Sequence, residues 1–207
     1  MSEAVKVERY WHYVTKDEYD KLMGVTPNMN WRLLLSLCRL AGMRRGEALN
    51  LTWSDINWEG NNIRIIAKKE WQPKDKNSRN VPLCPELQKL LLDAYNQAQP
   101  GQKRIIEGIV TVNLWRDFNV LLQRAGVSEY PKPFHTLRKS CITDWAASYP
   151  AHVVKEWAGH SSLDTTDRYY LQVPESEYSR ASRNSFWGQI SKSKFENKSN
   201  TIEAHTV

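Results

Sequence analysis

The spacing of apolar side chains along the chain predicts a mostly helical protein. Residues 30–41 are apolar on nearly every side and are followed by Gly42, which is typical of a core helix that ends at a left-handed glycine. Residues 85–97 and 111–125 carry apolar side chains on one side only, as helices on the surface of a core do. Further helices are predicted at residues 135–148, 151–158 and, approximately, 164–173 and 175–183.

Short sequence signals predict where other elements begin and end. The run Thr15-Lys16-Asp17-Glu18 is a capping box, in which a hydroxyl and a carboxylate satisfy free backbone N–H groups, so a short helix is expected up to about Met23. Another short helix is expected after Arg45. The run Tyr130-Pro131-Lys132-Pro133 is incompatible with a helix, so the next helix is expected to begin at His135.

Two β-branched runs predict a small sheet. Ile63–Ile66 follows the turn signal at residues 59–62, and Arg79–Leu83 is expected to be the returning strand of a long polar hairpin. The proline at position 82 favours an edge strand. The predicted fold class is therefore α+β, mainly α-helical with a small antiparallel β-sheet.

Length and composition predict one folded domain with a tail. The 207 residues are 41% hydrophobic and 25% charged, which is the balance of a soluble globular chain. Ser, Lys and Asn dominate from residue 191 onward. We expect a lead-in at residues 1–12, a domain at residues 13–190 and a disordered tail at residues 191–207.

The net charge and the spacing of the cysteines indicate which partners and which cellular compartment to expect. The net charge is +6, from 29 Lys and Arg against 23 Asp and Glu, which favours polyanionic partners without identifying one. The cysteines at positions 38, 84 and 141 are far apart and form no CxxC pair, so they predict free thiols in a reducing cytosol. No apolar stretch approaches the roughly 20 residues that span a bilayer, and no signal peptide is recognisable, which predicts a cytoplasmic location.

Three motifs carry candidate chemistry. The first runs from Gly42-Met43-Arg44-Arg45-Gly46-Glu47 to Asp55-Ile56. The second, His135-Thr136-Leu137-Arg138, places two side chains on one helical face. The third, Trp157–Tyr169, ends in a tyrosine nine positions after its histidine. Each motif alone fits an ordinary surface arginine, helix end or core tyrosine, but coincidence explains their combination poorly.

Taken in this order, the motifs resemble the three signature boxes of the tyrosine recombinases of the phage integrase family. The resemblance implies the catalytic-domain fold of these DNA breaking and rejoining enzymes. It also implies five of the family's six catalytic residues, which are Arg44, His135, Arg138, His160 and Tyr169.

The sixth catalytic residue in the family is a lysine on the hairpin. Residues 73–83 resemble the family pattern Lys-Thr-x-x-Ser-Arg-x-Val-Pro-Leu, which places this lysine at Lys74. Lys68, directly after the first strand, and Lys76 are alternatives. Within the same resemblance, the expected DNA contacts are Arg44, Lys74, Arg79 and Arg138.

The mechanism that the resemblance implies uses neither a metal nor a nucleotide cofactor. Tyr169 would attack the phosphodiester, form a 3′-phosphotyrosyl bond and release a 5′-hydroxyl. Arg44 and Arg138 would neutralise charge on the phosphate oxygens. The other roles would be a hydrogen bond to the phosphate from His160, protonation of the leaving oxygen by Lys74 and assistance to proton transfer by His135.

The implied partner is double-stranded DNA, with a homotetramer on DNA and a monomer when free. Residues 174–190 are expected either to dock on a neighbouring protomer or to pack on their own domain. The resemblance covers residues 13–173, so we expect a catalytic domain without the helical DNA-clamping, core-binding domain that precedes it in full-length members.

Other hypotheses stay open at this point. Tyr170 is a rival nucleophile, although neighbouring residues on a helix point about 100° apart and the motif spacing favours Tyr169. The chain could also be an inactive DNA-binding regulator or a type IB topoisomerase-like relaxase. A hydrolase that pairs a histidine with a cysteine is disfavoured, because no orienting triad accompanies either histidine.

Overall fold

The computed structural model describes residues 11–68, 71–72 and 78–160, and helix α2 (Met29–Leu40) lies at the centre of its core. The leucines of α2 that face the core are buried, as the apolar pattern predicted. Gly42 follows the helix with φ +56°, and a Cβ at this position would lie 2.8 Å from the ring of Trp145. Glycine is therefore needed here both for the left-handed conformation and for the close approach of α6.

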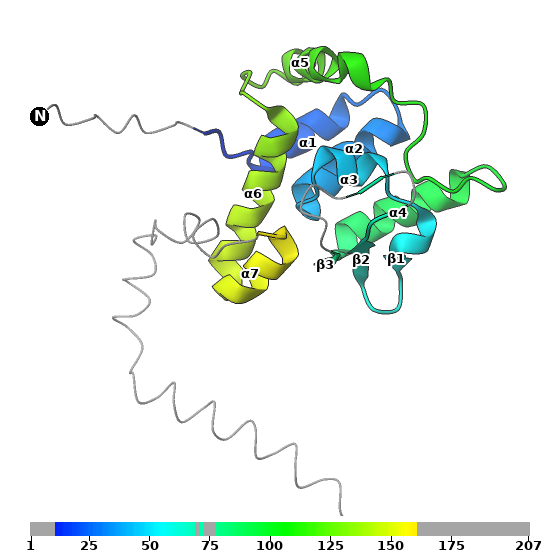
Figure 1. Ribbon diagram of the computed structural model, residues 1–207. Coiled ribbons are helices and arrows are strands. Elements are labelled where there is room, and N and C mark those ends of the chain that lie inside the picture. Colours follow the sequence, from blue (N-terminus) through cyan, green and yellow to red (C-terminus); the bar gives the residue numbers. More distant parts are fainter. Residues whose placement is uncertain (1–10, 69–70, 73–77, 161–207) are drawn as a thin grey trace, which may run out of the picture. The chain divides into compact units, whose positions relative to one another are not determined.

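The other helices surround α2 (Figure 1). They are α1 (Lys16–Gly24), α3 (Arg45–Leu49), α4 (Pro85–Gln97), α5 (Leu114–Ala125), α6 (Pro133–Ser148) and α7 (Ala151–Ala158), with the 3-10 turns η1 (Trp53–Asp55) and η2 (Thr111–Asn113). Helix α2 packs against α3, α4 and α6, whereas α7 packs against α6 and against strand β3. This packing brings the C-terminal end of α7 toward α3, which precedes it by about a hundred residues.

The helix boundaries follow the predicted ones closely. The capping box at Thr15 and Glu18 is present, and Gly126 ends α5 in the left-handed conformation. Helix α6 differs from the prediction, because it begins at Pro133 and not at His135. Proline is tolerated at the first helical position, where its missing N–H would have no intrahelical partner. Lys132 caps this helix with φ +52°.

The sheet has three antiparallel strands in the order β1 (Ile56–Asn57), β2 (Asn62–Ile65) and β3 (Arg79–Pro82). β3 is an edge strand of this sheet, as its proline predicted, while the two-residue strand β1 was not foreseen. Ile65 pairs with Arg79 across β2 and β3, and both side chains are buried. The register therefore directs an arginine side chain into the protein interior.

Several predictions fall outside the described residues. They concern the helices at 164–173 and 175–183, the segment 174–190, the tail 191–207, and the candidate residues Lys74, Lys76, Tyr169 and Tyr170. Cys38, Cys84 and Cys141 are described and carry free thiols, as expected. Within the described part, no helix is long and apolar enough to cross a membrane.

Candidate active site

Arg44 lies at the N-terminal cap of α3, in an extended conformation. Its backbone N–H donates to Glu47 Oε2 at 2.7 Å, and its guanidinium Nη1 donates to Glu47 Oε1 at 3.1 Å. Nη2 also reaches the carbonyl oxygen of Gly159 at 3.5 Å. The side chain of Arg44 is 26% exposed. It therefore reaches the surface while its guanidinium is hydrogen-bonded to Glu47 and Gly159.

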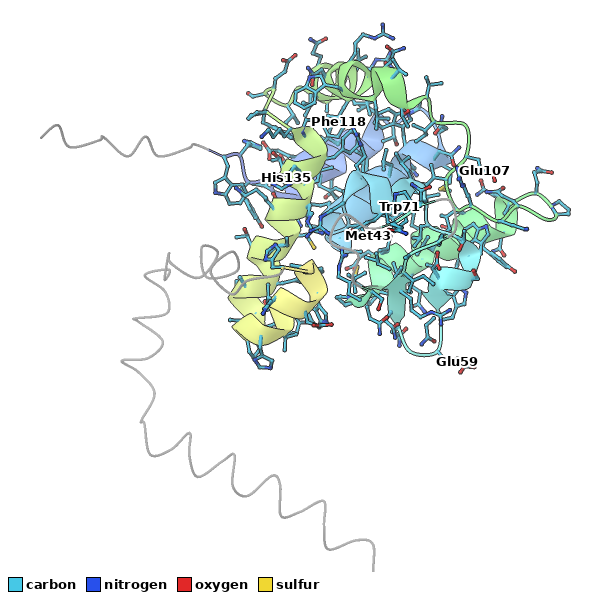
Figure 2. All side chains as sticks on the ribbon, in the orientation of Figure 1. Met43, Glu59, Trp71, Glu107, Phe118 and His135 are labelled. Atoms are coloured by element: carbon cyan, nitrogen blue, oxygen red, sulfur yellow. The ribbon has the colours of Figure 1, made fainter. Side chains whose placement is uncertain are left out.

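His135 and Arg138 project from one face of α6, as their spacing predicted. The guanidinium of Arg138 is buried and donates hydrogen bonds to the carbonyl oxygens of Gly42 and Ala158. His135, one turn earlier on the same helix, is exposed (Figure 2). Helix α6 thus carries the guanidinium of Arg138, which is fixed by hydrogen bonds, and one turn before it the solvent-exposed imidazole of His135.

The C-terminal end of α7 is a meeting point for three arginines. The last carbonyl groups of a helix have no intrahelical partner and carry the negative end of the helix dipole. Here the three successive carbonyl oxygens of residues 157, 158 and 159 accept hydrogen bonds from Arg79, Arg138 and Arg44 respectively. The sequence motifs did not predict this shared anchor.

Gly159 and His160 close the same helix. Gly159 has φ +62°, and the N–H of His160 donates to the carbonyl oxygen of Lys155 at 3.2 Å, which is the Schellman pattern of helix ends. His160 is therefore presented directly at the terminus on which the three arginines converge. The described structure thereby brings Arg44, Arg138 and His160 together, as the motifs implied, with His135 one turn before Arg138.

Glu47 is the centre of the charged cluster. Its carboxylate is 1% exposed and pairs with Arg79 at 2.6 and 2.8 Å, with Arg44 at 3.1 Å and with Arg138 at 3.9 Å. Burial alone would raise the pKa of Glu47, but the hydrogen bonds and charge of Arg79, the backbone N–H of Arg44 and the charge of Arg138 outweigh it and lower the pKa. Glu47 is thus ionised at neutral pH. Sequence reasoning passed over it, although it stands three positions after Arg44 in the first motif.

Arg79 lies in the interior, where its side chain is only 4% exposed. Its Nη1 and Nη2 donate to Glu47, and its Nε donates to the carbonyl oxygen of Trp157 at 3.0 Å. Its fork is occupied by a carboxylate, whereas both Nη atoms of the equally buried Arg138 donate to carbonyl oxygens, and the DNA contact expected of Arg79 from the sequence stays a prediction. The inward direction of this side chain follows from the register of β3, which the pattern of a four-residue strand does not reveal.

Among the candidate lysines, the structure describes Lys68. Its ammonium donates to the carbonyl oxygen of Asn50 at 2.7 Å, to Thr52 Oγ1 at 3.2 Å and to Asp55 Oδ2 at 2.5 Å. An ammonium has three donors, and these three contacts use them all. Lys68 is thus tied to the loop between α3 and η1, and this arrangement does not favour it as a proton donor to DNA.

Trp71 packs close to the N-terminal part of α3. Its backbone pairs with that of Lys68 in a short bridge, and Met43, Glu47, Lys68 and Trp71 all line one small cavity. The start of the long hairpin therefore lies against the first motif. Lys74 and Lys76 lie further along the hairpin, outside the described residues.

Partial burial and the surrounding cations lower the pKa of His135 below its ordinary value of 6.5. The cations are Arg138, Lys139, Lys132 and Arg44. His135 is therefore neutral at pH 7 in the free protein, with an imidazole nitrogen able to accept a proton.

We expect an NMR titration of the free protein to give a midpoint below 6.5 for the His135 ring. Substitution Lys139→Met removes one of the charges that lower the pKa and should raise this midpoint, whereas Lys89→Met on the surface of α4 should leave it unchanged. A wild-type midpoint at or above 6.5 would contradict the electrostatic picture of the site.

The fold is shared with solved structures of one class of protein. The catalytic domain of bacteriophage HP1 integrase matches with a TM-score of 0.61 and 22% identity, over 84% of this chain and 96% of that domain. A structure of the XerH site-specific recombinase bound to its difH substrate matches with a TM-score of 0.61 and 21% identity, over 83% of this chain and 51% of XerH. The predicted fold class, that of tyrosine recombinase catalytic domains, is therefore confirmed.

Sequence comparison narrows this class to one family. The sequence profile of the phage integrase family matches residues 12–177. A tyrosine recombinase described as XerC-like, from Caldanaerobacter subterraneus subsp. tengcongensis, is 27% identical over 205 residues, which is 81% of this chain and 52% of the relative. The chain belongs to the phage integrase family, and it spans about half the length of the curated relatives it matches.

Proposed function

We propose that this chain is the catalytic domain of a tyrosine-type site-specific recombinase, which cleaves and rejoins DNA through a bond between Tyr169 and a 3′-phosphate. The observation that supports this most is the convergence of Arg44 and Arg138 on the end of α7, immediately before His160. Tyr169 follows His160 by nine positions in the sequence. This arrangement supports a site in which groups suited to binding phosphate lie just before the sequence segment that contains Tyr169.

Strand cleavage exchanges one phosphodiester bond for another. The phenolic oxygen of Tyr169 attacks phosphorus, and the bond from phosphorus to the 5′ oxygen breaks. Negative charge develops on the non-bridging oxygens, where Arg44 and Arg138 neutralise it and His160 donates a hydrogen bond. Rejoining reverses these steps with a 5′-hydroxyl as the attacking group, so the bond energy is conserved and no nucleotide cofactor is consumed.

Two proton transfers accompany the exchange. Neutral His135 accepts the phenolic proton, which a group of ordinary pKa near 10 does not release readily at pH 7. Lys74 donates a proton to the leaving 5′ oxygen. Since the two guanidiniums supply the positive charge at the phosphate, no step in this scheme calls for a metal ion.

The proposal also covers the DNA substrate, the limits of the domain, the oligomeric state and the location of the protein. Double-stranded DNA is the proposed substrate, supported by the net charge of +6 and by the fold shared with XerH, which was solved on its difH substrate. We propose residues 13–190 as the domain, a homotetramer on DNA, and a cytoplasmic location. The activity of the whole protein is part of the same proposal.

A covalent adduct is the direct test. The protein is incubated at low salt with a pool of nicked duplexes that carry randomised inverted repeats, and the sample is then denatured and separated. We expect DNA that stays attached to protein after denaturation, with the nucleotide mapped by mass spectrometry to the peptide that contains Tyr169. Absence of any adduct across the pool would overturn the proposed function.

The contacts of Lys68 lead to a separate prediction about the general acid. Substitution Lys74→Ala should slow cleavage by about 10²- to 10⁴-fold, the usual range for loss of a positioned acid. Cleavage should recover on DNA with a 5′-thiol leaving group, because a thiolate departs without a proton. Substitution Lys68→Ala removes the ammonium that pairs with Asp55, so any defect should persist on the thiol substrate. If the thiol substrate restored cleavage by Lys68→Ala, the general acid would be Lys68 and not Lys74.

A further inference from the structure

Arg79 connects three parts of the fold through one side chain. It starts on strand β3, its fork grips Glu47 of α3, and its Nε reaches the carbonyl oxygen of Trp157 at the end of α7. Each of its three guanidinium nitrogens donates to an atom of the protein. Arg79 therefore ties together elements that are far apart in the sequence and that carry the candidate catalytic residues.

The atoms that Arg79 holds are neighbours of the atoms that orient the proposed phosphate ligands. The Glu47 oxygen that accepts from Arg79 Nη1 also accepts from Arg44 Nη1. The carbonyl next to that of Trp157 accepts from Arg138, and the following one accepts from Arg44. A shift of Arg79 would consequently move the oxygen atoms that accept hydrogen bonds from Arg44 and Arg138.

Gly159 shows how closely Arg79 passes over the end of α7. A Cβ on Gly159 would lie 2.8 Å from Arg79 Cδ and 3.1 Å from its Nε. The residue that follows is His160, whose backbone N–H closes the helix. The side chain of Arg79 thus lies directly against the turn that sets the position of His160.

We propose that Arg79 is a positioning residue for phosphate activation. Arg79 fixes the positions of Glu47 and of the last carbonyl groups of α7, so that Arg44, Arg138 and His160 converge on one phosphate. Arg79 itself makes no contact with DNA. This inference rests on the proposed function, because it assigns a role within that site.

Lysine cannot take over this role. A guanidinium grips a carboxylate with two parallel hydrogen bonds and keeps a third donor on Nε, whereas an ammonium is a single point charge on a flexible stem. Substitution Arg79→Lys therefore preserves the charge beside Glu47 and removes the geometry. Arg64 on the adjacent strand offers a matched control, because it is exposed and donates to the carbonyl oxygen of Ser54.

We expect Arg79→Lys to bind DNA within about twofold of wild type, with the same salt dependence, and to form the covalent adduct about 10²-fold more slowly, since small misplacements of catalytic groups have effects of this size. Arg64→Lys should cleave at the wild-type rate. If Arg79→Lys cleaved as fast as wild type, the inference would be overturned. Weaker binding with a shallower salt dependence would also overturn it, because that result marks a direct phosphate contact.

A second substrate separates positioning from loss of folded protein. Replacing one non-bridging oxygen of the target phosphate by a methyl group removes the charge that Arg44 and Arg138 neutralise. If Arg79 acts through these arginines, the defect of Arg79→Lys should shrink at least about tenfold on this methylphosphonate. The ratio of rates on the two substrates, measured on one protein sample, does not depend on the folded fraction. An equal defect on both substrates would mean a merely structural role and would overturn the inference, whereas failure of wild type to form an adduct would concern the proposed function.

Discussion

Substitution of Tyr169 by phenylalanine is expected to abolish the covalent protein–DNA adduct, while Tyr170→Phe should retain it. Phenylalanine lacks the phenolic oxygen that attacks phosphorus, and an adjacent tyrosine on a helix would point about 100° away from it. The pair differs in one oxygen atom at neighbouring positions, so each variant is the control for the other. DNA binding by both should match wild type, because phosphate affinity rests on the cationic groups.

The measurement is the yield of denaturation-resistant adduct on the nicked duplexes selected by wild-type protein, together with the binding affinity for the same duplexes. Loss of the adduct in Tyr169→Phe with unchanged binding is the expected outcome. Persistence of the adduct in Tyr169→Phe, combined with its loss in Tyr170→Phe, would move the nucleophile to Tyr170. This result would also break the nine-residue spacing from His160 on which the assignment depends.

Most of the fold could be predicted from the sequence because its signals are local. The capping box at Thr15 and the apolar run of α2 each follow from a few neighbouring residues, and α7 has the predicted bounds. The start of α6 was misplaced because the proline run was taken as a barrier, although Pro133 fits the first turn. Strand β1 was missed because two residues are too few for an alternating pattern.

The candidate site was only partly predictable, for a different reason. The motifs identified Arg44, His135, Arg138 and His160 by type and spacing, and the structure places Arg44, Arg138 and His160 at the end of α7, with His135 one turn before Arg138 on α6. The inward direction of Arg79 depends on strand register, which no local pattern specifies. The contacts between arginines and the carbonyl groups of α7 join residues about 20 to 115 positions apart, and such pairs leave no periodic trace in the sequence.

The charge balance of the cluster formed by Arg44, Glu47, Arg79 and Arg138 supports the proposal that it binds an anion. Three guanidiniums surround one carboxylate. The last carbonyl groups of α7 add a partial negative charge, which is too small to balance the other two guanidiniums. The cluster therefore keeps an excess of positive charge, which also helps to lower the pKa of the nearby His135. In the proposed function, a bound phosphate would relieve the repulsion among Arg44, Arg79 and Arg138, and the same positive charge would stabilise the charge that develops during phosphoryl transfer.

Removal of the carboxylate should show how strongly the fold depends on this balance. Substitution Glu47→Ala would leave three arginines without their shared counter-ion in the interior, and breaking a buried pair in this way is expected to lower the free energy of unfolding by about 3–5 kcal/mol. Urea unfolding followed by circular dichroism measures this change. Glu86→Ala, at an exposed position in the first turn of α4, is the control and should stay within about 0.5 kcal/mol of wild type.

The same ion pair predicts a pH dependence of stability. Because the pKa of Glu47 is lower in the folded protein than its ordinary value of 4.5, folding stabilises the carboxylate, and this contribution is fully present above that value. It is lost as the pH falls through the folded pKa, since the carboxyl group then becomes protonated. The stability difference between wild type and Glu47→Ala should therefore be constant from pH 6 to 8 and should narrow below about pH 4.5. A difference that stayed below about 1 kcal/mol at neutral pH would mean that the carbonyl groups of α7 and of Gly42 hold the three arginines in place without the carboxylate.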